Sequence, residues 1–479
     1  MLLRNVFIFI YLITTLILFS TFNASAGLWL SFFGNAVLLT LITYYHIFIE
    51  KAYSPFLSTY IVFNYLFFLV APIVQAGVLG PMEVGLFENK YPFDEVTFMK
   101  TNGLIAIFHV VFFLFYVSIK GYIKTKTKEI KVNKIPASSL FRDNLIFIVL
   151  SVIFIAISFP FLMDEYVRPG WFVSPYSPGF QLVFKKVLYT LPLAGIIVSK
   201  MVFDKNGIST QTWIINLAIC FVLFLILFVV KNPLVEKRNA LGPIYLLILY
   251  LFYPRLFNSN VKTSLVLFLA MIIGFPLVQI LTHINYGIDD VINNPSLITD
   301  VIDNGALSKG YMSLNYDAFC NIGVAMEVVK ENGFSYGFQL LSALLFFIPR
   351  GVWVGKPDSS GLVLGDYLIE NYDYHFANIS NPVVSEGYMN FGIPGIIIMA
   401  IALAMSMIYF LTWLNSNDIF KRSVAFYYAI HLLFLLRGDF TNGYSYFIGT
   451  LVGLYIIPKL IIKLSHFIFD QKIWVSKKN

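Results

Sequence analysis

Long runs of apolar residues dominate this chain, and they leave lipid as the only solvent that suits most of it. Each run holds roughly twenty residues, mostly Phe, Leu, Ile and Val, which is the length of a membrane-spanning helix. Lipid offers no hydrogen-bond partners to the backbone, so each run is predicted to be a transmembrane helix. The runs, about twelve, lie near residues 5–22, 27–49, 56–79, 98–119, 144–162, 181–203, 211–230, 239–253, 263–283, 382–414, 423–436 and 444–462.

The composition excludes a soluble protein. Of 479 residues, 58% are hydrophobic and 12% are charged, against about 25% charged in an average soluble domain. Soluble enzymes, nucleic-acid binders and coiled coils are therefore excluded. We predict an all-α, polytopic membrane protein with about twelve transmembrane helices and one large external loop that contains short helices. The predicted organisation is a nine-helix membrane bundle over 1–283, the loop over 284–381, and C-terminal membrane helices with a basic tail over 382–479.

The placement of charge predicts the orientation. Segment 120–143 carries seven basic residues against two acidic ones, so the positive-inside rule makes it cytoplasmic. Counting spans from it places both termini in the cytoplasm and the loop 284–381 outside. The first span also resembles a signal peptide, with Arg4 and an Ala24-Ser25-Ala26 site, but an uncleaved span is favoured because the next run starts at once.

One short connection departs from this pattern. Lys231, Lys237 and Arg238, opposed only by Glu236, fall on the outer side between the seventh and eighth predicted spans. Either a span is miscounted or the side chains snorkel, or these cations bind an anion at the outer face.

The external loop contains a cationic segment suited to a lipid-linked phosphate. A short helix over 338–348, lying in or dipping into the membrane interface, is followed by Arg350, Trp353 and Lys356 beside two glycines. Arg350 can bind phosphate oxygens bidentately, Lys356 adds a point charge, and Trp353 can stack on a sugar or anchor in headgroups. The alternative is that these residues only anchor the end of a helix.

A carboxylate follows at the predicted start of the tenth span. Glu386 and Asn390 are four residues apart and are expected to share a helix face. Burial would raise the pKa of Glu386 toward a value useful for removing a proton from a hydroxyl. The alternative is a structural ion pair with Arg350 or Arg437. His375, in an aromatic loop, is a weaker candidate for the same role.

No metal or other cofactor is expected. Cys220 and Cys320 lack metal-ligand spacing, and Asp289-Asp290 is a possible metal pair that suits a solvated turn better. Arg437 and Asp439 follow the eleventh predicted span, again on the outer side. Four cations are therefore expected to converge beside one carboxylate, forming a site for a diphosphate with a base: Arg238, Arg350, Lys356 and Arg437.

Short motifs in the last third of the chain resemble those of the bacterial oligosaccharide repeat-unit polymerases, the Wzy-type O-antigen polymerases. They are Phe347-Ile348-Pro349-Arg350 with Trp353 and Lys356-Pro357, then Glu386-Gly387-Tyr388 with Asn390-Phe391-Gly392 and Gly395, then Arg437-Gly438-Asp439. The resemblance implies a multi-pass glycosyltransferase of the bacterial inner membrane. Such enzymes join undecaprenyl-diphosphate-linked glycans at the outer face and build O-antigen or capsule-type polysaccharide, as in lipopolysaccharide.

The resemblance also implies roles for individual residues and partners. Arg238, Arg350, Lys356 and Arg437 would hold the lipid diphosphate without a metal. The residues themselves, and not the resemblance, suggest contacts with the sugar or the interface from Trp353, Tyr388, Asn390 and Asp439, and catalysis by Glu386 or His375. The expected partners are the lipid-linked donor and acceptor glycans, membrane lipids and a chain-length regulator protein, with no nucleic acid.

The expected reaction is an inverting displacement in which an acceptor hydroxyl attacks the anomeric carbon and lipid diphosphate leaves. Two other functions remain open. A flippase or transporter would need polar residues through the bilayer midplane, whereas an O-antigen ligase would use the same chemistry with a different acceptor. A membrane acyltransferase is disfavoured because His109 and His283 lack acidic neighbours in the sequence.

Overall fold

A computed structural model describes residues 2–79, 94–122, 136–167, 174–233, 236, 238–274, 311 and 314–476. Across these residues the chain forms α-helices with short π and 3₁₀ segments and contains no strand. The protein is therefore an all-α polytopic membrane protein, as predicted.

The helices of the first half are α1 (Leu2–Thr21), α2 (Ala26–Tyr44), η1 (Tyr45–Ile49), α3 (Pro55–Tyr65), η2 (Leu66–Val70), α4 (Ala71–Leu79), α5 (Glu95–Tyr122), α6 (Ala137–Ile157), α7 (Phe159–Val167), α8 (Pro178–Gln181), η3 (Leu182–Val187), η4 (Leu188–Thr190), α9 (Leu191–Phe203), α10 (Thr210–Val230), α11 (Arg238–Phe252), η5 (Pro254–Phe257), α12 (Asn260–Phe268) and η6 (Leu269–Gly274). The second half contains η7 (Leu314–Tyr316), α17 (Ala318–Asn332), α18 (Phe338–Leu344), α19 (Ser360–Tyr372), α20 (Val383–Phe391), α21 (Ile393–Leu414), α22 (Ile419–Arg437), α23 (Phe440–Leu451), η8 (Val452–Ile456) and α24 (Ile457–Ser476).

Ten stretches of helix in the described residues are long and apolar enough to cross a membrane. They are Leu2–Thr21, Ala26–Ile49, Pro55–Ala76, Glu95–Gly121, Ser138–Ile157, Pro178–Phe203, Thr210–Val230, Ile393–Leu414, Ile419–Arg437 and Phe440–Phe469. Two shorter apolar helices, Ala240–Phe252 and Asn260–Ile272, correspond to the remaining predicted runs. The run at 423–436 proves longer than expected, whereas the end of the run at 263–283 lies outside the described residues.

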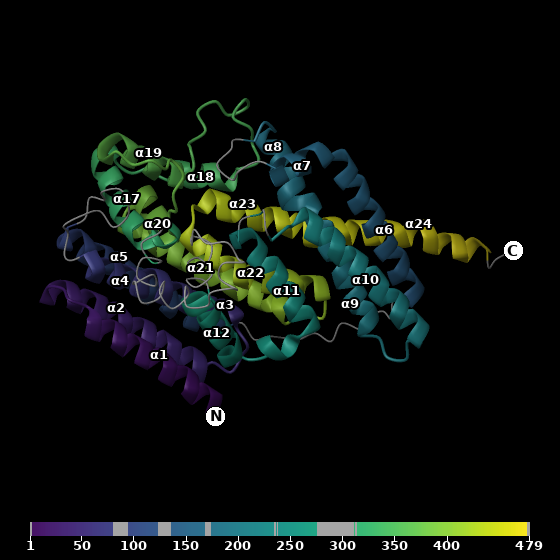
Figure 1. Cartoon of the computed structure of the whole chain (residues 1–479), viewed down its shortest axis with the longest axis horizontal. Coiled ribbons are helices and arrows are strands. Elements are labelled where there is room, and N and C mark those ends of the chain that lie inside the picture. The colour runs from purple at the N-terminus through teal and green to yellow at the C-terminus, as the bar shows by residue number, and fades with distance from the viewer. Residues whose placement is uncertain are drawn as a thin grey trace, which may run out of the picture.

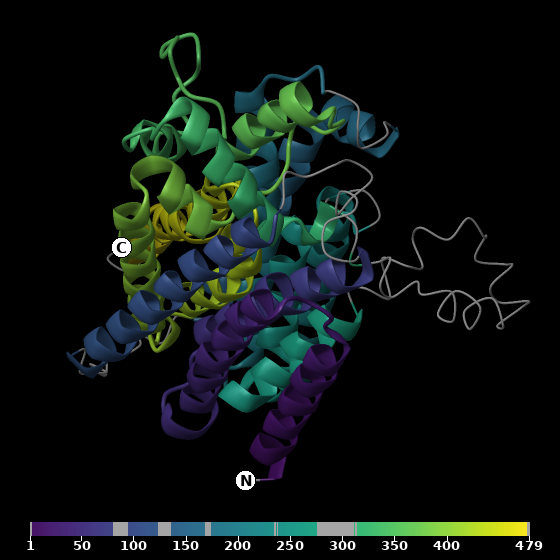
Figure 2. The same ribbon diagram turned by 90° about the vertical axis from the view of Figure 1, so that its left-hand side faces the viewer.

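Within the described residues, α3 lies inside the bundle and other helices form an apolar periphery. Every residue of α3 is buried, against α2, α12 and α22. In contrast, α1 and α10 leave most of their apolar side chains exposed, as expected for helices that face lipid. Figure 1 shows α17, α18, α19 and α20 grouped at one end of the bundle, away from the start of α1 and the end of α24. Figure 2 shows the same separation, with the purple start of α1 at the bottom and this green group at the top.

The predicted single span at 382–414 is wrong, because the helix breaks at Gly392. This residue has a φ of +64°, a left-handed conformation that glycine adopts without strain. The break lets α20 fold against α21. At their closest approach, a Cβ atom added to Gly395 would lie 1.9 Å from the carbonyl oxygen of Gly387. Glycine at both positions is therefore required for the turn that carries Glu386.

We expect Gly395→Ala to destabilise the protein by about 3 kcal/mol, because the methyl group must push two backbones apart. The melting temperature of the purified protein in detergent measures this effect. Gly103→Ala is the matched control, since a Cβ atom there meets nothing within 4 Å on another helix of the bundle. Equal melting temperatures for the two variants would contradict the close packing of α20 against α21.

Candidate functional site

Glu386 joins three segments that are far apart in the sequence. It lies in the first turn of α20 and its residue is only 2% exposed. Its Oε1 atom accepts a hydrogen bond from the backbone N–H of Phe440 at 2.8 Å, at the start of α23. The same oxygen accepts the hydroxyl of Ser360, at the start of α19. One carboxyl group therefore connects α19, α20 and α23.

Asn390 fixes the orientation of this part of α20. Its amide donates to the carbonyl oxygen of Glu386 at 2.8 Å, so the predicted shared helix face is confirmed. Its Oδ1 atom accepts the hydroxyl of Ser335 at 2.8 Å and the backbone N–H of Leu340 at 3.4 Å. These bonds engage Asn390 within the protein, which favours a positioning role over the predicted sugar contact.

The surroundings of Glu386 favour its neutral form. Burial raises the pKa of this carboxyl group to about 8, and the nearby carboxylate of Asp439 acts in the same direction. The hydrogen bonds from Ser360, Phe440 and Asn381 act in the opposite direction but are outweighed. At neutral pH, Glu386 is therefore mostly protonated, and its ionised form is a stronger base than an ordinary carboxylate.

Asp439 is the second buried carboxyl group of the site. It caps the N-terminus of α23 and accepts from the backbone N–H of Asn442 at 2.7 Å and from the Asn442 side chain at 2.8 Å. Burial raises its pKa, while Asn442, Ser359 and Lys186 lower it. Asp439 directly precedes Phe440, whose N–H binds Glu386, so the two buried carboxyl groups belong to the same part of the structure.

Arg437 is paired with a different carboxylate from the one anticipated. It donates to Asp317 at 3.0 Å, across from the start of α17. Asp317 is buried, and it also accepts the backbone N–H of Ser380 at 3.2 Å and the Ser380 hydroxyl. The Arg437 side chain stays 24% exposed. The alternative of a Glu386 ion pair with Arg350 or Arg437 is not supported, because each arginine has its own aspartate.

Arg350 and Lys356 differ in availability. Arg350 binds Asp358 in an ion pair in which both side chains are about half exposed, and such pairs exchange partners at little cost. The ammonium group of Lys356 donates to the carbonyl oxygens of Leu345, Phe346 and Ile348, at 2.9 to 3.0 Å. All three of its N–H donors are then used at the end of α18. The predicted diphosphate contact of Lys356 is therefore disfavoured, since capping this chain end already occupies it.

The two arginines nevertheless belong to the same end of the protein. Asp358, the partner of Arg350, lies two residues before Ser360, whose hydroxyl binds Glu386. Arg437 lies three residues before Phe440, whose N–H binds the same carboxyl group. The structure therefore connects both arginines to Glu386 through short segments.

The remaining predicted site residues have no hydrogen bond to Glu386 among the described contacts. Arg238 begins α11, but its side chain is outside the described residues. His375 is exposed in the connection between α19 and α20, unlike the buried Glu386. Tyr388 is half-buried with its ring 6.1 Å from that of Phe334, and the Trp353 ring lies 5.6 Å from that of Phe338.

Lys186 is a site residue that sequence reasoning missed. It lies in the π-helix η3, donates to the hydroxyl of Ser445 at 2.6 Å, and stands 4.2 Å above the ring of Tyr446. Gly449 permits this approach, because a Cβ atom there would lie 2.6 Å from that of Lys186. The available signal was a lysine pair inside an apolar run, since charged residues within a membrane helix are costly and often functional.

Lys231 also contacts η3, the helix that carries Lys186. It is buried and donates to Glu236 at 2.8 Å and to the backbone carbonyl of Lys185 at 2.7 Å. Its charge is balanced by Glu236, which agrees with a structural role for this lysine.

No family model, curated protein or solved structure matches this chain. Among the residues that the structure describes, no group of three or more His, Cys, Asp or Glu side chains is arranged to hold a metal ion. The predicted pair Asp289 and Asp290 lies outside those residues. The arrangement at α19, α20 and α23 therefore has to be interpreted from its own chemistry.

The raised pKa of Glu386 predicts a pH-dependent stability. Between the unfolded-state pKa, near 4.3, and about 8, the folded protein holds one more proton than the unfolded chain. Its contribution to the free energy of unfolding therefore falls as the pH rises, by up to about 1.4 kcal/mol per pH unit. Unfolding from pH 5 to 8.5 should show that this slope is lost in Glu386→Gln. The exposed Glu370→Gln should keep it; loss of slope in both variants would contradict this assignment.

The Arg437–Asp317 pair predicts a stability effect that a second substitution reverses. Arg437→Gln should cost about 1 to 3 kcal/mol, because Asp317 is left as an uncompensated buried charge. Adding Asp317→Asn removes that charge and should recover most of the loss. Additive losses in the double variant, measured by thermal unfolding, would show that the two side chains do not act as a pair.

Proposed function

We propose that this protein is a glycosyltransferase of the bacterial inner membrane that polymerises undecaprenyl-diphosphate-linked oligosaccharide repeat units at the outer face. The observation that carries the proposal is the buried carboxyl group of Glu386, whose pKa is about 8, at the end of the bundle that also holds Arg437, Arg350 and Lys186. A proton acceptor beside fixed cations suits a reaction in which a hydroxyl attacks and an anion leaves.

The proposed step is a single displacement. The acceptor hydroxyl oxygen forms a bond to the anomeric carbon of the donor, and the bond from that carbon to the diphosphate oxygen breaks. The bonding electrons leave with the lipid diphosphate, and the hydroxyl proton passes to the Glu386 carboxylate. The configuration at the anomeric carbon is inverted. Because Glu386 must be ionised to accept the proton, the rate should rise as the pH approaches 8.

Cationic side chains would stabilise the leaving diphosphate. Charge grows on it during the reaction, so fixed cations stabilise the transition state more than the bound substrate. Arg350 is the most available cation, since its partner Asp358 is also exposed. Arg437 retains an exposed edge, and Lys186 adds a charge close to Asp439. Arg238, at the start of α11, stays in the proposed set, whereas Lys356 is better assigned to capping α18.

The remaining groups would arrange the substrates. Trp353 and Tyr388 offer aromatic surfaces on which a sugar ring can stack. Asp439 would keep a negative charge beside Glu386, and so help to hold its proton affinity high. Asn390 would position Glu386 by fixing the orientation of α20 through its hydrogen bonds.

The experiment that tests the proposal is an incubation of purified full-length protein in nanodiscs with lipid-linked repeat units, with and without EDTA. A ladder of products, present in both conditions, supports a polymerase that works without a divalent ion. A single added block on another acceptor would instead indicate a ligase, and movement across the bilayer without a new bond would indicate a flippase.

Glu386→Gln should reduce the polymerisation rate by about 10²- to 10⁴-fold, the usual contribution of a general base. The amide resembles the protonated carboxyl group that predominates at neutral pH, so the fold should persist. Glu370→Gln, on the exposed face of α19, is the control for the loss of an unrelated carboxylate. A Glu386→Gln variant that polymerises at the normal rate across pH 6 to 9 would eliminate this residue as the base.

The double variant Asp317→Asn/Arg437→Gln separates the two roles of Arg437. If Arg437 only balances Asp317, the double variant should regain both stability and activity. If it also contacts the diphosphate, stability should return while activity remains at least about tenfold reduced, as expected when a charged partner of an anion is removed. We expect the second result.

A further inference from the structure

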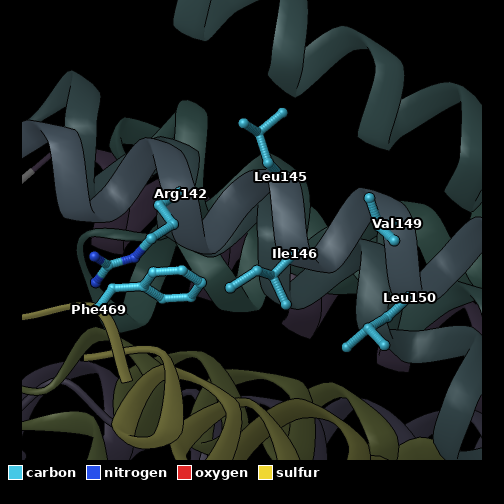
Figure 3. A pocket seen from close by; sticks show the side chains of 6 residues that line it. All are labelled: Arg142, Leu145, Ile146, Val149, Leu150 and Phe469. Atoms are coloured by element: carbon cyan, nitrogen blue, oxygen red, sulfur yellow. The ribbon is translucent and has the colours of Figure 1, made fainter. Parts of the chain in front are cut away.

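A groove opens between α6 and α24 at the end of the bundle opposite the proposed catalytic site. It is lined by Arg142, Leu145, Ile146, Val149, Leu150 and Phe469, and its volume is about 250 Å³. Figure 3 shows the four aliphatic side chains following one another along α6, with Arg142 and Phe469 together at one end. The groove is therefore apolar along most of its length and has one cationic side chain, Arg142, at one end.

The apolar part of the groove lies along helices of membrane-spanning length. Both walls belong to helices that are long and apolar enough to span a membrane. Leu145 and Val149 are each 54% exposed on the outside of the bundle. Water would find no hydrogen-bond partners along these aliphatic side chains, so a hydrocarbon chain is the occupant that fits.

Arg142 is held at the end of the groove by α24. Its guanidinium lies 5.0 Å from the ring of Phe469, and its Nε atom donates to Ser465 at 2.9 Å. Ser465 in turn donates to Asp143, which also binds His466 at 3.1 Å. This network joins the start of α6 to α24 and keeps the cation near the end of both spans.

The sequence that precedes Arg142 is rich in positive charge. The segment 120–143 leads into α6 and carries seven basic residues against two acidic ones. In the sequence of α24, Lys463 stands two residues before Ser465, and Lys472 follows near the end of the helix. A cluster of cations next to a membrane helix attracts anionic headgroups, at about 1 kcal/mol per residue.

We propose that this groove binds an anionic phospholipid of the leaflet that borders segment 120–143, with one acyl chain along α6 and the phosphate beside Arg142. The site lies away from α19, α20 and α23, so it is independent of the proposed transfer reaction. Its ligand is a resident membrane lipid, distinguished from other lipids by its charge.

Native mass spectrometry of the full-length protein, released from nanodiscs containing equal amounts of phosphatidylglycerol and phosphatidylcholine, tests this proposal. The wild-type protein should retain phosphatidylglycerol in preference to phosphatidylcholine. Arg142→Gln should reduce that preference about fivefold, the effect of one interfacial cation. Val149→Trp should reduce retention of both lipids at this site, because the indole fills the apolar part of the groove.

Two controls keep the result interpretable. Arg255→Gln removes an exposed cation from the connection between α11 and α12, and Val222→Trp enlarges an exposed side chain on α10; both should behave as wild type. Because Val149→Trp leaves the Arg142 network intact, it tests the groove even if Arg142→Gln fails to fold. Equal retention of the two lipids by the wild type, or unchanged retention in both groove variants, would overturn the proposal and indicate only a general lipid annulus.

Discussion

The hydrogen bonds to the Glu386 carboxyl group connect three helices, α19, α20 and α23, at one end of this bundle. Ser360 and the backbone N–H of Phe440 bind the same oxygen, so the loop helix α19 and the membrane helix α23 are fixed to α20 at one point. Burying such a group is costly unless it is hydrogen-bonded or neutral. Here it is hydrogen-bonded, and a pKa of about 8 keeps it mostly neutral at pH 7. The raised pKa lets the protein bury this group in its neutral form, and it also makes the ionised form a stronger base than an ordinary carboxylate.

Glycines make this arrangement sterically possible. The contact of Gly387 with Gly395 folds α20 onto α21, and Gly449 lets η3 bring Lys186 beside Ser445. Each contact brings two backbones closer than any side chain would permit. The positions of Glu386 and Lys186 therefore depend on glycines that take no part in the proposed reaction. The ion pairs of Arg350 and Arg437 complete this end of the bundle, one exposed and one mostly buried.

Sequence reasoning predicted the site in part. Glu386, its shared face with Asn390 and the direction of its pKa shift followed from the spacing of a carboxylate at the end of an apolar run. Sequence did not predict that Asp317 would pair with Arg437, because 120 residues separate the two side chains in the chain. Lys356 looked like a phosphate ligand for the same reason, since nothing local indicated that three carbonyl groups would occupy its ammonium. Lys186 was overlooked because its apolar neighbours dominated the pattern.

The sequence by itself determined that this is a helical membrane protein, and approximately where its helices lie. That information is local, because a backbone in lipid must satisfy its hydrogen bonds within each apolar segment. Only the tertiary structure decided where the helix at 382–414 breaks, which carboxylate each cation meets and which oxygen Ser360 and Phe440 share. Those outcomes depend on contacts between distant segments, where the close approach of helices and the burial of charge select one set of partners from many that the sequence would allow.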